Sequence, residues 1–474
     1  MDAALTSLLI LSGAVVLAYF FLVNGFQTLL MLSASLELGR YRRRSQGDDP
    51  RKLLGSEVAP TISVLAPAFN EEATIVESVR ALLALSYPRV EVVVVNDGST
   101  DATLANLAEA FELTPVHPIF RRRIDTAPVW GLYRSRLHPR LVVVDKDNGG
   151  KADALNAGLN VSSGDLVCSL DADTLVESDA LLRMVRPFLA DPGVVAVGGT
   201  IRVANDAEVR YGRVVRARVP RHLLPGVQTI EYLRAFLFGR LGWNRLGGNL
   251  IISGAFGLFD REGVLAVGGY EASTVGEDLE LVAKLRRVAA EERRPGRVEF
   301  LPDPVAWTEV PSNLASLGRQ RDRWHRGLAD VLWRHRRIIG NPRYGALGTV
   351  ASLAFLIVEL LAPVIELLGL LTVAIALPRG ALDVTFAWTL LLVAYGWGVL
   401  LSLLAITLEE LSFRRLGSVT DRLLLVLWAL VEPLGYRQLT VVWRLRGLVR
   451  WLAGHGDWGT MQRRGFAVVP DSSA

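Results

Sequence analysis

Long apolar stretches lie near both ends of the chain, and a region of short, alternating elements lies between them. Leu5 to Leu36 is almost continuously apolar, and about 20 such residues are enough to cross a bilayer. Leu347 to Leu377 and Val384 to Leu408 are two further stretches of this kind. The pattern therefore predicts one membrane span before the middle region and two spans after it.

Four short runs in the middle region have the length and the apolar, largely β-branched content of strands that are buried on both faces. They are Ile62 to Pro67, Val90 to Val95, Leu141 to Val144 and Asp165 to Leu170. Helical periodicity follows the first three, at Glu71 to Leu85, Asp101 to Phe111 and Lys151 to Leu159. This alternation predicts a doubly wound, mostly parallel α/β sheet with right-handed crossovers.

The rest of the middle region is less regular. We expect Val194 to Ile201 to be a strand, Asn249 to Phe259 to be an apolar strand pair, and Phe120 to His138 to be irregular. Ser312 to Arg337 has the pattern of a basic amphipathic helix directly before the second span. Helices of that composition lie at membrane interfaces, so we expect this one to be interfacial.

The last apolar stretch, Leu423 to Val442, is interrupted by Glu432, Pro433 and Arg437. A central charge costs about 2.5–3.5 kcal/mol on insertion scales, so we expect a re-entrant or interfacial segment instead of a fourth span. Two C-terminal spans then return the chain to the side on which the first span ends. The basic residues after the first span and after the last span predict that this side is the cytoplasm.

The composition narrows the class of protein and the kinds of site in three ways. Hydrophobic residues make up 51% of the 474 residues, which is more than an ordinary soluble enzyme carries. The formal net charge of +4 implies no broad nucleic-acid-binding surface. The single cysteine, Cys168, excludes an intrachain disulfide and a Cys-rich metal site.

Together these patterns predict six parts. They are an N-terminal transmembrane helix (1–40), a linker (41–60), an α/β catalytic domain (61–311), an amphipathic interfacial helix (312–343), two transmembrane helices (344–412), and a re-entrant or interfacial segment with a basic cytoplasmic tail (413–474).

Candidate site residues lie at or after the end of each of the four predicted parallel strands. They are Pro67, Asn70 and Glu71 for the first, Asp97 at the end of the second, Lys151 after the third, and Asp171 and Asp173 after the fourth. The carboxyl ends of such strands form the ligand-binding edge of a sheet. Paired carboxylates there suit Mg²⁺ or Mn²⁺ holding a diphosphate, and glycines before a lysine let the backbone approach a phosphate. The plain alternative for each position is a polar turn or a helix cap.

Two further motifs lie beyond the strands. Glu277 and Asp278 begin a predicted helix, where acids act as simple caps or, at Asp278, as a general base for a hydroxyl. Gln320, Arg323 and Trp324 lie on the expected interfacial helix, and both a binding role and a lipid-anchoring role are open for them.

The order Asp97, Asp171-x-Asp173, Glu277-Asp278 and Gln320-x-x-Arg323-Trp324 resembles the motifs of membrane-bound family 2 glycosyltransferases, the group of cellulose, hyaluronan, chitin and poly-N-acetylglucosamine synthases. The resemblance covers roughly Ile62 to Trp324. Residues 148–158 (NGGKADALNAG) and 253–256 (SGAF) resemble the poly-N-acetylglucosamine synthase branch. Gly276 departs from the family pattern, which usually has threonine before Glu-Asp.

The resemblance implies a GT-A fold with a nucleotide-sugar site at Pro67, Asn70, Glu71, Asp97, Lys151 and Asp171. In it, Asp97 contacts the uracil or ribose, Lys151 contacts the diphosphate, and Asp171 and Asp173 hold the nucleotide and its Mg²⁺ or Mn²⁺. Asp278, next to Glu277, is implied as the base of an inverting, single-displacement transfer. Ser253 and Gly254 are implied to lie beneath the acceptor, and Gln320, Arg323 and Trp324 to border the diphosphate and the acceptor sugar.

The resemblance further implies an inner-membrane enzyme with a cytoplasmic catalytic domain. It would transfer a sugar, GlcNAc or glucose, from a UDP-sugar to a growing β-linked polysaccharide. Three spans are fewer than exporting synthases usually have, so an accessory export subunit or a second copy of the chain remains open as a partner. A lipid-linked acceptor that yields a glycolipid is the alternative, and an inactive transferase-like scaffold is a third. Glu359 and Glu366, two helical turns apart, suit either a polar sugar path or contacts within the helix bundle.

Overall fold

The computed structural model describes residues 3–45, 49–56, 58–117, 120–171, 174–210, 212–413 and 418–454. The chain divides into two compact units. Among the described residues, the sheet unit lies within Arg40–Arg218 and Asn249–Val310, and the helical unit lies within Met1–Gly39, Val219–Gly248 and Pro311–Gly459. Residues 219–248 thus interrupt the sheet unit and belong to the helical one.

The sheet unit is built on a ten-stranded sheet with the order β3-β4-β5-β2-β1-β6-β11-β8-β12-β7. Its central strands are β1 (Ile62–Ala68), β2 (Val90–Asp97), β5 (Leu141–Lys146) and β6 (Leu166–Leu170). All three pairings among them are parallel. The predicted parallel core is therefore confirmed, and its β-branched side chains are buried on both faces, as in Val92 to Val95.

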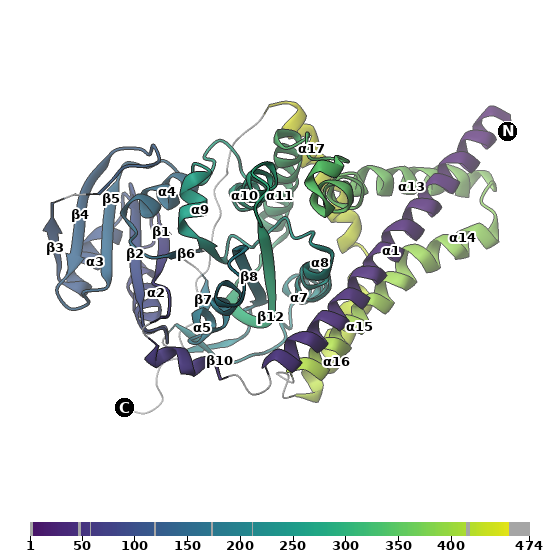
Figure 1. Ribbon diagram of the computed structural model, residues 1–474. Coiled ribbons are helices and arrows are strands. Elements are labelled where there is room, and N and C mark those ends of the chain that lie inside the picture. Colours follow the sequence, from purple (N-terminus) through teal and green to yellow (C-terminus); the bar gives the residue numbers. More distant parts are fainter. Residues whose placement is uncertain are drawn as a thin grey trace. The chain divides into compact units, whose positions relative to one another are not determined.

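Helices cover these strands, as Figure 1 shows for α2, α3 and α4. They are α2 (Ile75–Leu83), α3 (Thr103–Phe111) and α4 (Lys151–Val161). Helix α4 lies close to the sheet because its inner face is made of small residues. A Cβ at Gly158 would lie 3.2 Å from Leu65 Cδ2, so only a residue without a side chain fits comfortably there. This close packing fixes the start of α4, and with it Lys151, at the edge of the sheet.

The second half of the sheet is mixed. Its strands are β7 (Leu175–Val176), β8 (Val194–Val203), β11 (Phe256–Asp260) and β12 (Arg297–Thr308). Strand β11 runs antiparallel between β6 and β8, while β12 is parallel to β8. The remaining elements of the unit are η1 (Pro50–Gly55), α5 (Ala180–Met184), α6 (Arg186–Ala190), the β9–β10 hairpin (Glu208–Arg210 and Arg213–Arg216), α9 (Arg261–Ala266) and α10 (Glu277–Glu291).

Two local predictions for this unit were wrong. Phe120 to His138 is not irregular throughout, because Val129–Ser135 forms strand β4, which pairs antiparallel with β5 and with β3 (Leu113–Val116). These strands are half exposed, so the apolar run that revealed the central strands is missing from them. Asn249 to Phe259 forms only the single strand β11, because its first residues make an irregular loop around Ser253 and Gly254.

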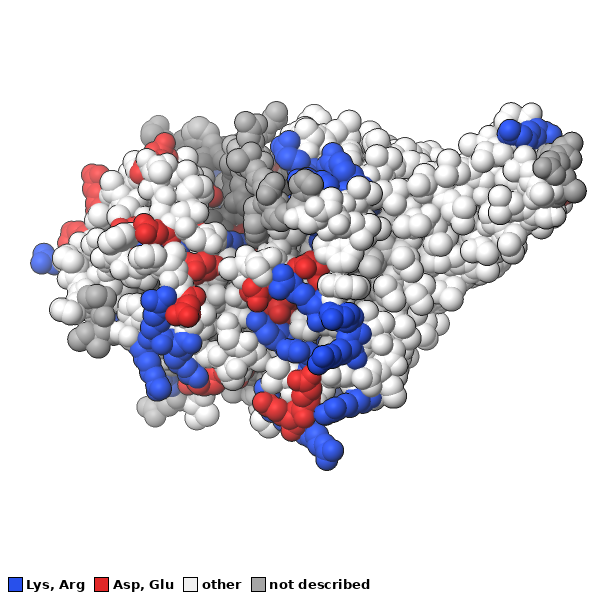
Figure 2. All heavy atoms as spheres, turned by 90° about the horizontal axis from the view of Figure 1, so that it is seen from above, with Lys and Arg blue, Asp and Glu red and all other residues white. Residues whose placement is uncertain are grey.

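The helical unit contains helices that are long and apolar enough to cross a membrane. By length and composition, three candidate spans are found among the described residues: Ala4–Ser45, Leu347–Arg379 and Val384–Phe413. The first belongs to α1 (Ala3–Ser45), which continues beyond Gly39 into the sheet unit. In Figure 2 the surface over the outer parts of these helices is almost free of charged residues except at the tip. These findings agree with the predicted number of spans.

The second and third spans are not uniform α-helices. The second comprises η4 (Leu347–Ala351), α12 (Ser352–Ala354), η5 (Phe355–Leu360), α13 (Ala362–Ala376) and η6 (Leu377–Arg379). The third comprises α14 (Val384–Leu391), η7 (Leu392–Gly396) and α15 (Trp397–Phe413). Segments η4, η5 and η7 are π-helical, and π-turns of this kind are frequent at functional sites.

Shorter helices complete the unit. They are α7 (Leu223–Leu233), the π-helical η2 (Arg234–Arg240), α8 (Leu241–Leu246), α11 (Leu314–Arg334), η3 (Pro342–Tyr344), α16 (Val419–Val431) and α17 (Tyr436–Leu452). The stretch that was expected to be re-entrant or interfacial is a helix–turn–helix of α16 and α17. The helical conformation is interrupted between Pro433 and Gly435, and Gly435 has a φ of 83°. The interruption predicted from Glu432 and Pro433 is therefore real.

Candidate active site

Lys151 is the centre of the charged cluster at the carboxyl edge of the sheet. It is the first residue of α4 and follows Gly150, whose φ of 84° lets the loop turn into the helix. Its Nζ lies 2.6 Å from Oδ1 of Asp171, which follows β6, and 3.1 Å from Oε1 of Glu277, the first residue of α10. Three residues from distant parts of the sequence thus meet at the edge where strand ends were predicted to converge.

The charges in this cluster support each other. Burial by itself would lower the pKa of Lys151, but the adjacent carboxylates of Asp171 and Glu277 outweigh it and raise that pKa. Burial raises the pKa of Glu277, and Lys151 acts against this rise. Lys151 is therefore held as a cation whose ammonium can also approach an anionic ligand.

Asp278 lies beside this cluster and is held by two backbone groups. The N–H of Gly254 donates to its Oδ2 at 2.9 Å, and the N–H of Leu279 donates to its Oδ1 at 2.8 Å. The loop at Ser253 and Gly254 therefore comes against the start of α10. Each carboxylate oxygen keeps a further lone pair, so Asp278 is fixed in direction and still able to accept a proton.

Gly254 leaves little room for a side chain. A Cβ there would lie 3.0 Å from Lys151 Nζ and 3.2 Å from Asp278 Oδ2. We predict that Gly254→Ala lowers turnover about tenfold by shifting these two groups. Both atoms end flexible side chains, so the free energy of unfolding should change by no more than about 1 kcal/mol. Steady-state UDP release and thermal unfolding measure the two effects.

Gly55→Ala is the matched control, since a Cβ at Gly55 would meet nothing within 4 Å. It should leave turnover and stability unchanged. Unchanged turnover in Gly254→Ala would mean that the spacing between Lys151 and Asp278 does not matter.

Asp97 is not an open carboxylate. Its side chain accepts hydrogen bonds from Lys146 Nζ at 2.6 Å, from the N–H of Gly149 at 3.0 Å and from the N–H of Gly150 at 2.8 Å. Only 3% of the residue is exposed. It therefore joins the end of β2 to the glycine loop before Lys151.

Lys146 and Asp153 belong to this network, although the sequence did not single them out. Lys146 Nζ lies 2.6 Å from Asp153 Oδ1 as well as from Asp97, and the lysine side chain is fully buried. A lysine at the end of a strand usually reads as a solvated residue. No pattern in the sequence marks Lys146 as buried, because β5 is apolar on both faces and shows no alternation.

The first predicted loop is joined to the second. Asn70, which has a φ of 54°, receives a hydrogen bond on its Oδ1 from the N–H of Thr100 at 2.8 Å. The N–H of Asn70 donates to Ser99 Oγ, and the N–H of Glu71 donates to Thr103 Oγ1. Asn70 and Glu71 thus hold together the loops after β1 and β2, directly after Pro67 and Ala68 at the end of β1.

The other predicted residues lie elsewhere or outside the description. Gln320, Arg323 and Trp324 are on α11 of the helical unit, where Gln320 is buried and Trp324 is 44% exposed. Asp173, an expected metal ligand, lies outside the described residues. Leaving aside such undescribed positions, no group of three or more His, Cys, Asp or Glu residues that could hold a metal ion is found.

The acidic residues nonetheless fit a divalent cation. The side chain of Asp171 is 29% exposed, so it retains room for a second partner besides Lys151. Mg²⁺ is usually bound by one or two carboxylates, with substrate phosphates and waters completing its shell. Asp171 and Asp173 would supply such a pair, so a cage of three protein ligands is not required.

Comparison with known proteins identifies the relatives of the chain. Residues 63–262 match the model of glycosyl transferase family 2, and residues 166–401 match that of glycosyl transferase family group 2. The poly-beta-1,6-N-acetyl-D-glucosamine synthase of Staphylococcus aureus (strain COL) is 31% identical over 274 residues, which cover 58% of this chain and 56% of that protein. The enzyme of the same name from Staphylococcus epidermidis is 29% identical with the same coverage.

The chain therefore matches about half the length of these curated relatives. Among solved structures, a mannosyltransferase from Pyrobaculum calidifontis in complex with GDP-Man and Mn²⁺ is 20% identical, with a TM-score of 0.49, covering 91% of this chain and 99% of that one. The family models, the similarity to the synthases and the α/β sheet with its acidic edge agree: the chain belongs to glycosyltransferase family 2, with a GT-A fold.

Proposed function

We propose that the protein is an inverting membrane glycosyltransferase that transfers GlcNAc or glucose from a UDP-sugar to a growing β-linked polysaccharide. The observation that carries the proposal is Lys151, which lies between Asp171 and Glu277, with Asp278 held beside it by Gly254. This arrangement combines a cation for a diphosphate with a fixed carboxylate for a hydroxyl. The similarity to poly-beta-1,6-N-acetyl-D-glucosamine synthases supports the choice of product class.

On the donor side, Lys151 is the group that faces the diphosphate. Asp171 and Asp173 would hold Mg²⁺ or Mn²⁺, which when bound supplies positive charge for the departing diphosphate. Lys151 adds to that charge from a fixed position, so little reorganisation is needed as the bond to the sugar breaks. Asp97, Asn70 and Glu71 keep the surrounding loops in place for the nucleotide.

On the acceptor side, Asp278 removes the proton from the attacking hydroxyl. The hydroxyl oxygen forms a bond to the anomeric carbon while the bond from that carbon to the diphosphate breaks, and UDP leaves. One displacement inverts the anomeric centre, so no covalent intermediate on the protein is required. Gly254 and Leu279 fix the direction of the carboxylate by their hydrogen bonds to it. The resemblance assigns Ser253, Gln320, Arg323 and Trp324 to the acceptor and diphosphate.

The membrane assignment rests on the three candidate spans, and the cytoplasmic side rests on the basic residues that follow the first of them, from Arg40 to Arg44. Glu359 and Glu366 contact arginines of α17 within the helical unit. This favours the second of the two roles considered for them, contacts within the bundle. Export of the product would then require a path made by other residues, by a second copy or by an accessory subunit.

The test uses purified protein in nanodiscs with Mg²⁺ or Mn²⁺ and a panel of labelled UDP-sugars. We expect one donor to give UDP release and a high-molecular-weight product, and EDTA to abolish both until the metal is restored. A single lipid-soluble product would replace the polysaccharide by a glycolipid. No turnover with any donor, with or without added lipid acceptor, would contradict the proposed activity.

A further inference from the structure

Asp322 lies inside the Gln320-x-x-Arg323-Trp324 motif of α11, and it is more deeply buried than any of the motif residues, being 1% exposed. Its Oδ1 lies 3.1 Å from Arg446 Nε, and its Oδ2 lies 3.0 Å from Arg450 Nη1. Both arginines belong to α17. A third contact, from Oδ2 to Arg326 Nε at 3.4 Å, comes from one turn further along α11. One buried carboxylate therefore joins the motif helix to α17.

The two helices touch closely around this carboxylate. A Cβ at Gly447 would lie 2.5 Å from the carbonyl oxygen of Asp322, and a Cβ at Gly318 would lie 2.8 Å from Trp443 Nε1. Arg446 also donates to the carbonyl of Gly318 at 3.1 Å. Small residues on both helices thus let the backbones approach, so the ion pairs lie between helices that have little freedom to slide.

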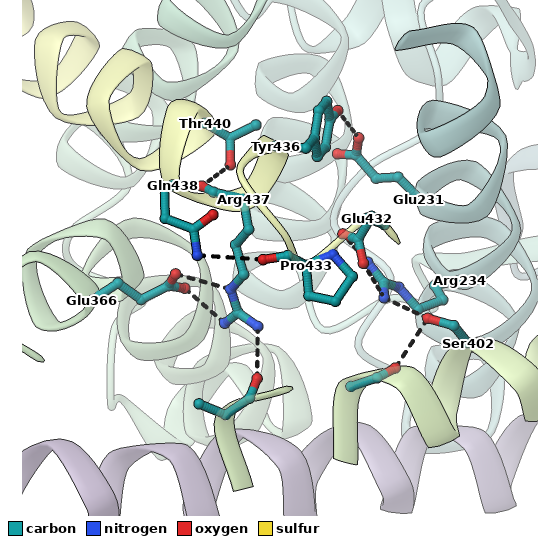
Figure 3. Close-up of polar contacts among 12 residues, drawn as sticks. Glu231, Arg234, Glu366, Ser402, Glu432, Pro433, Tyr436, Arg437, Gln438 and Thr440 are labelled. Atoms are coloured by element: carbon teal, nitrogen blue, oxygen red, sulfur yellow. Dashed lines mark hydrogen bonds and ion pairs between the residues drawn. The ribbon is translucent and has the colours of Figure 1, made fainter. Parts of the chain in front are cut away.

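Arg321, the other residue between Gln320 and Arg323, is anchored in a second direction. Its guanidinium forms a bidentate ion pair with Glu231 of α7, with N–O distances of 2.8 and 2.7 Å. The hydroxyl of Tyr436, at the start of α17, donates to the same Glu231 at 2.6 Å, as Figure 3 shows. Burial by itself would lower the pKa of Arg321, but Glu231 outweighs it and raises that pKa, so the guanidinium stays charged.

Helix α17 is in turn fixed to the second span. Arg437 forms a bidentate ion pair with Glu366 of α13, in which both N–O distances are 2.9 Å (Figure 3). It also donates to the carbonyl of Ala394. One turn before it, Glu432 binds Arg234 of η2, whose Nη1 also donates to Ser402 of the third span. Arg444 contacts Glu359. Acids within the spans are thus matched by cations of the α16–α17 region.

We propose that Asp322 is a positioning residue for the transfer reaction. Its ion pairs with Arg446 and Arg450 of α17 fix the position of α11, and with it the positions of Gln320, Arg323 and Trp324. The inference rests on the proposed function, because it concerns the motif that the family resemblance assigns to the diphosphate and the acceptor sugar. Arg321 and Asp322 are the two positions that the motif itself leaves unspecified. In this chain both are buried anchors, one toward α7 and one toward α17.

Asp322→Asn tests the proposal in nanodiscs. The amide keeps the size of the side chain but not its charge, so the guanidinium groups of Arg446 and Arg450 lose their common partner. We expect kcat for sugar transfer to fall about 10- to 100-fold, because small displacements of positioning groups have effects of this size. The KM for the UDP-sugar should stay within about twofold, since Lys151, Asp171 and Asp97 belong to the sheet unit and are unchanged. Asp322→Glu should recover part of the rate.

A double variant keeps the proposal testable if Asp322→Asn folds poorly. Arg446 and Arg450 have side chains that are 49% and 37% exposed, so Arg446→Gln with Arg450→Gln should fold, and it should reproduce the loss in kcat. Adding both changes to Asp322→Asn should lower kcat little further, because the contacts are already lost. Asp330→Asn, which removes only an exposed pair with Arg334 on the same helix, is the matched control and should retain full activity.

The failure of this proposal differs from a failure of the proposed function. If the unmodified protein releases UDP but folded Asp322→Asn and the double variant turn over normally, the positioning role is wrong and the activity stands. A rise in donor KM with unchanged kcat would also overturn it. Absence of turnover in the unmodified protein contradicts the activity itself.

Discussion

Replacing Asp278 with asparagine is expected to lower sugar transfer about 10²–10⁴-fold, the usual contribution of a general base. The amide oxygen can still receive the N–H of Gly254, so the loop should keep its place against α10, and only the hydrogen bond from the N–H of Leu279 is lost. What is lost is the site that accepts the proton of the attacking hydroxyl. The KM for the UDP-sugar should change little, because Lys151 and Asp171 remain paired. Radiolabelled transfer and UDP release, measured over a range of donor concentrations, check both values.

Asp260→Asn is the control for this change. Asp260 is likewise at the start of a helix, as the N-cap of α9, where its Oδ2 accepts the N–H of Gly263 at 2.7 Å. It performs a capping role without proximity to Lys151, and asparagine caps helices about as well as aspartate does, so Asp260→Asn should leave both the free energy of unfolding and kcat nearly unchanged. If Asp278→Asn behaves like Asp260→Asn, then Asp278 is only a helix cap.

Removal of the central cation should have the second large effect. In Lys151→Met, Asp171 and Glu277 lose the ammonium that contacts both of them. We expect kcat to fall about 10²-fold, since a fixed cation no longer faces the diphosphate. We expect the free energy of unfolding to fall by about 1–3 kcal/mol, because charged groups are left without their partner. Turnover assays and thermal unfolding of the purified variant report the two quantities.

The loss of stability should depend on pH in one direction. Burial already raises the pKa of Glu277, and Lys151 counteracts that rise, so the variant should raise this pKa further. A carboxyl group whose pKa is higher in the folded than in the unfolded state favours folding below its unfolded pKa. That contribution is lost as the pH rises through the folded pKa. The variant should therefore lose the most stability, relative to the unmodified protein, at pH values above the raised pKa of Glu277.

Lys284→Met is the matched control for both measurements. Lys284 lies on α10 and pairs with the buried Glu280 one turn before it, at 3.4 Å. Like Lys151, it pairs with a buried glutamate of α10, but it does not lie at the edge of the sheet. Equal losses of kcat in the two variants would show that the ion pair matters for α10 and not for the diphosphate.

The meeting of Lys151, Asp171 and Glu277 could be predicted in outline from the sequence. The first two follow buried parallel strands, and strands of that kind end at a common edge. What the pattern could not give is the partner of each charge. Asp97 reads as a free carboxylate at a strand end, yet its oxygens are occupied by Lys146 and two backbone N–H groups. That arrangement depends on a lysine turned inward, which no local periodicity reveals.

Strand β4 at the edge of the sheet and the ion pairs of the helical unit could likewise not be predicted from local sequence. Strand β4 was missed because its exposed side chains, such as Trp130, remove the apolar run that marks a buried strand. Glu359 and Glu366 could be recognised as costly acids within a span, but their arginines lie about 70 residues or more further along the chain, on α17. Contacts across such distances follow from the fold and are not written in any one segment. The functional roles of the predicted site residues remain predictions for the variants above.

The interruption of the sheet unit by Val219–Gly248 has a consequence for biosynthesis. Lys151 and Asp171 leave the ribosome before this insertion, whereas Gly254, Glu277 and Asp278 leave it afterwards. Strand β11 can add to β6 and β8 only when the insertion has been made. The half of the sheet that contains Lys151 and Asp171 can therefore form early during translation, while the half that is followed by Glu277 and Asp278 must wait. A nascent chain thus has no complete transferase centre before its bundle-forming segments α7 and α8 have been synthesised.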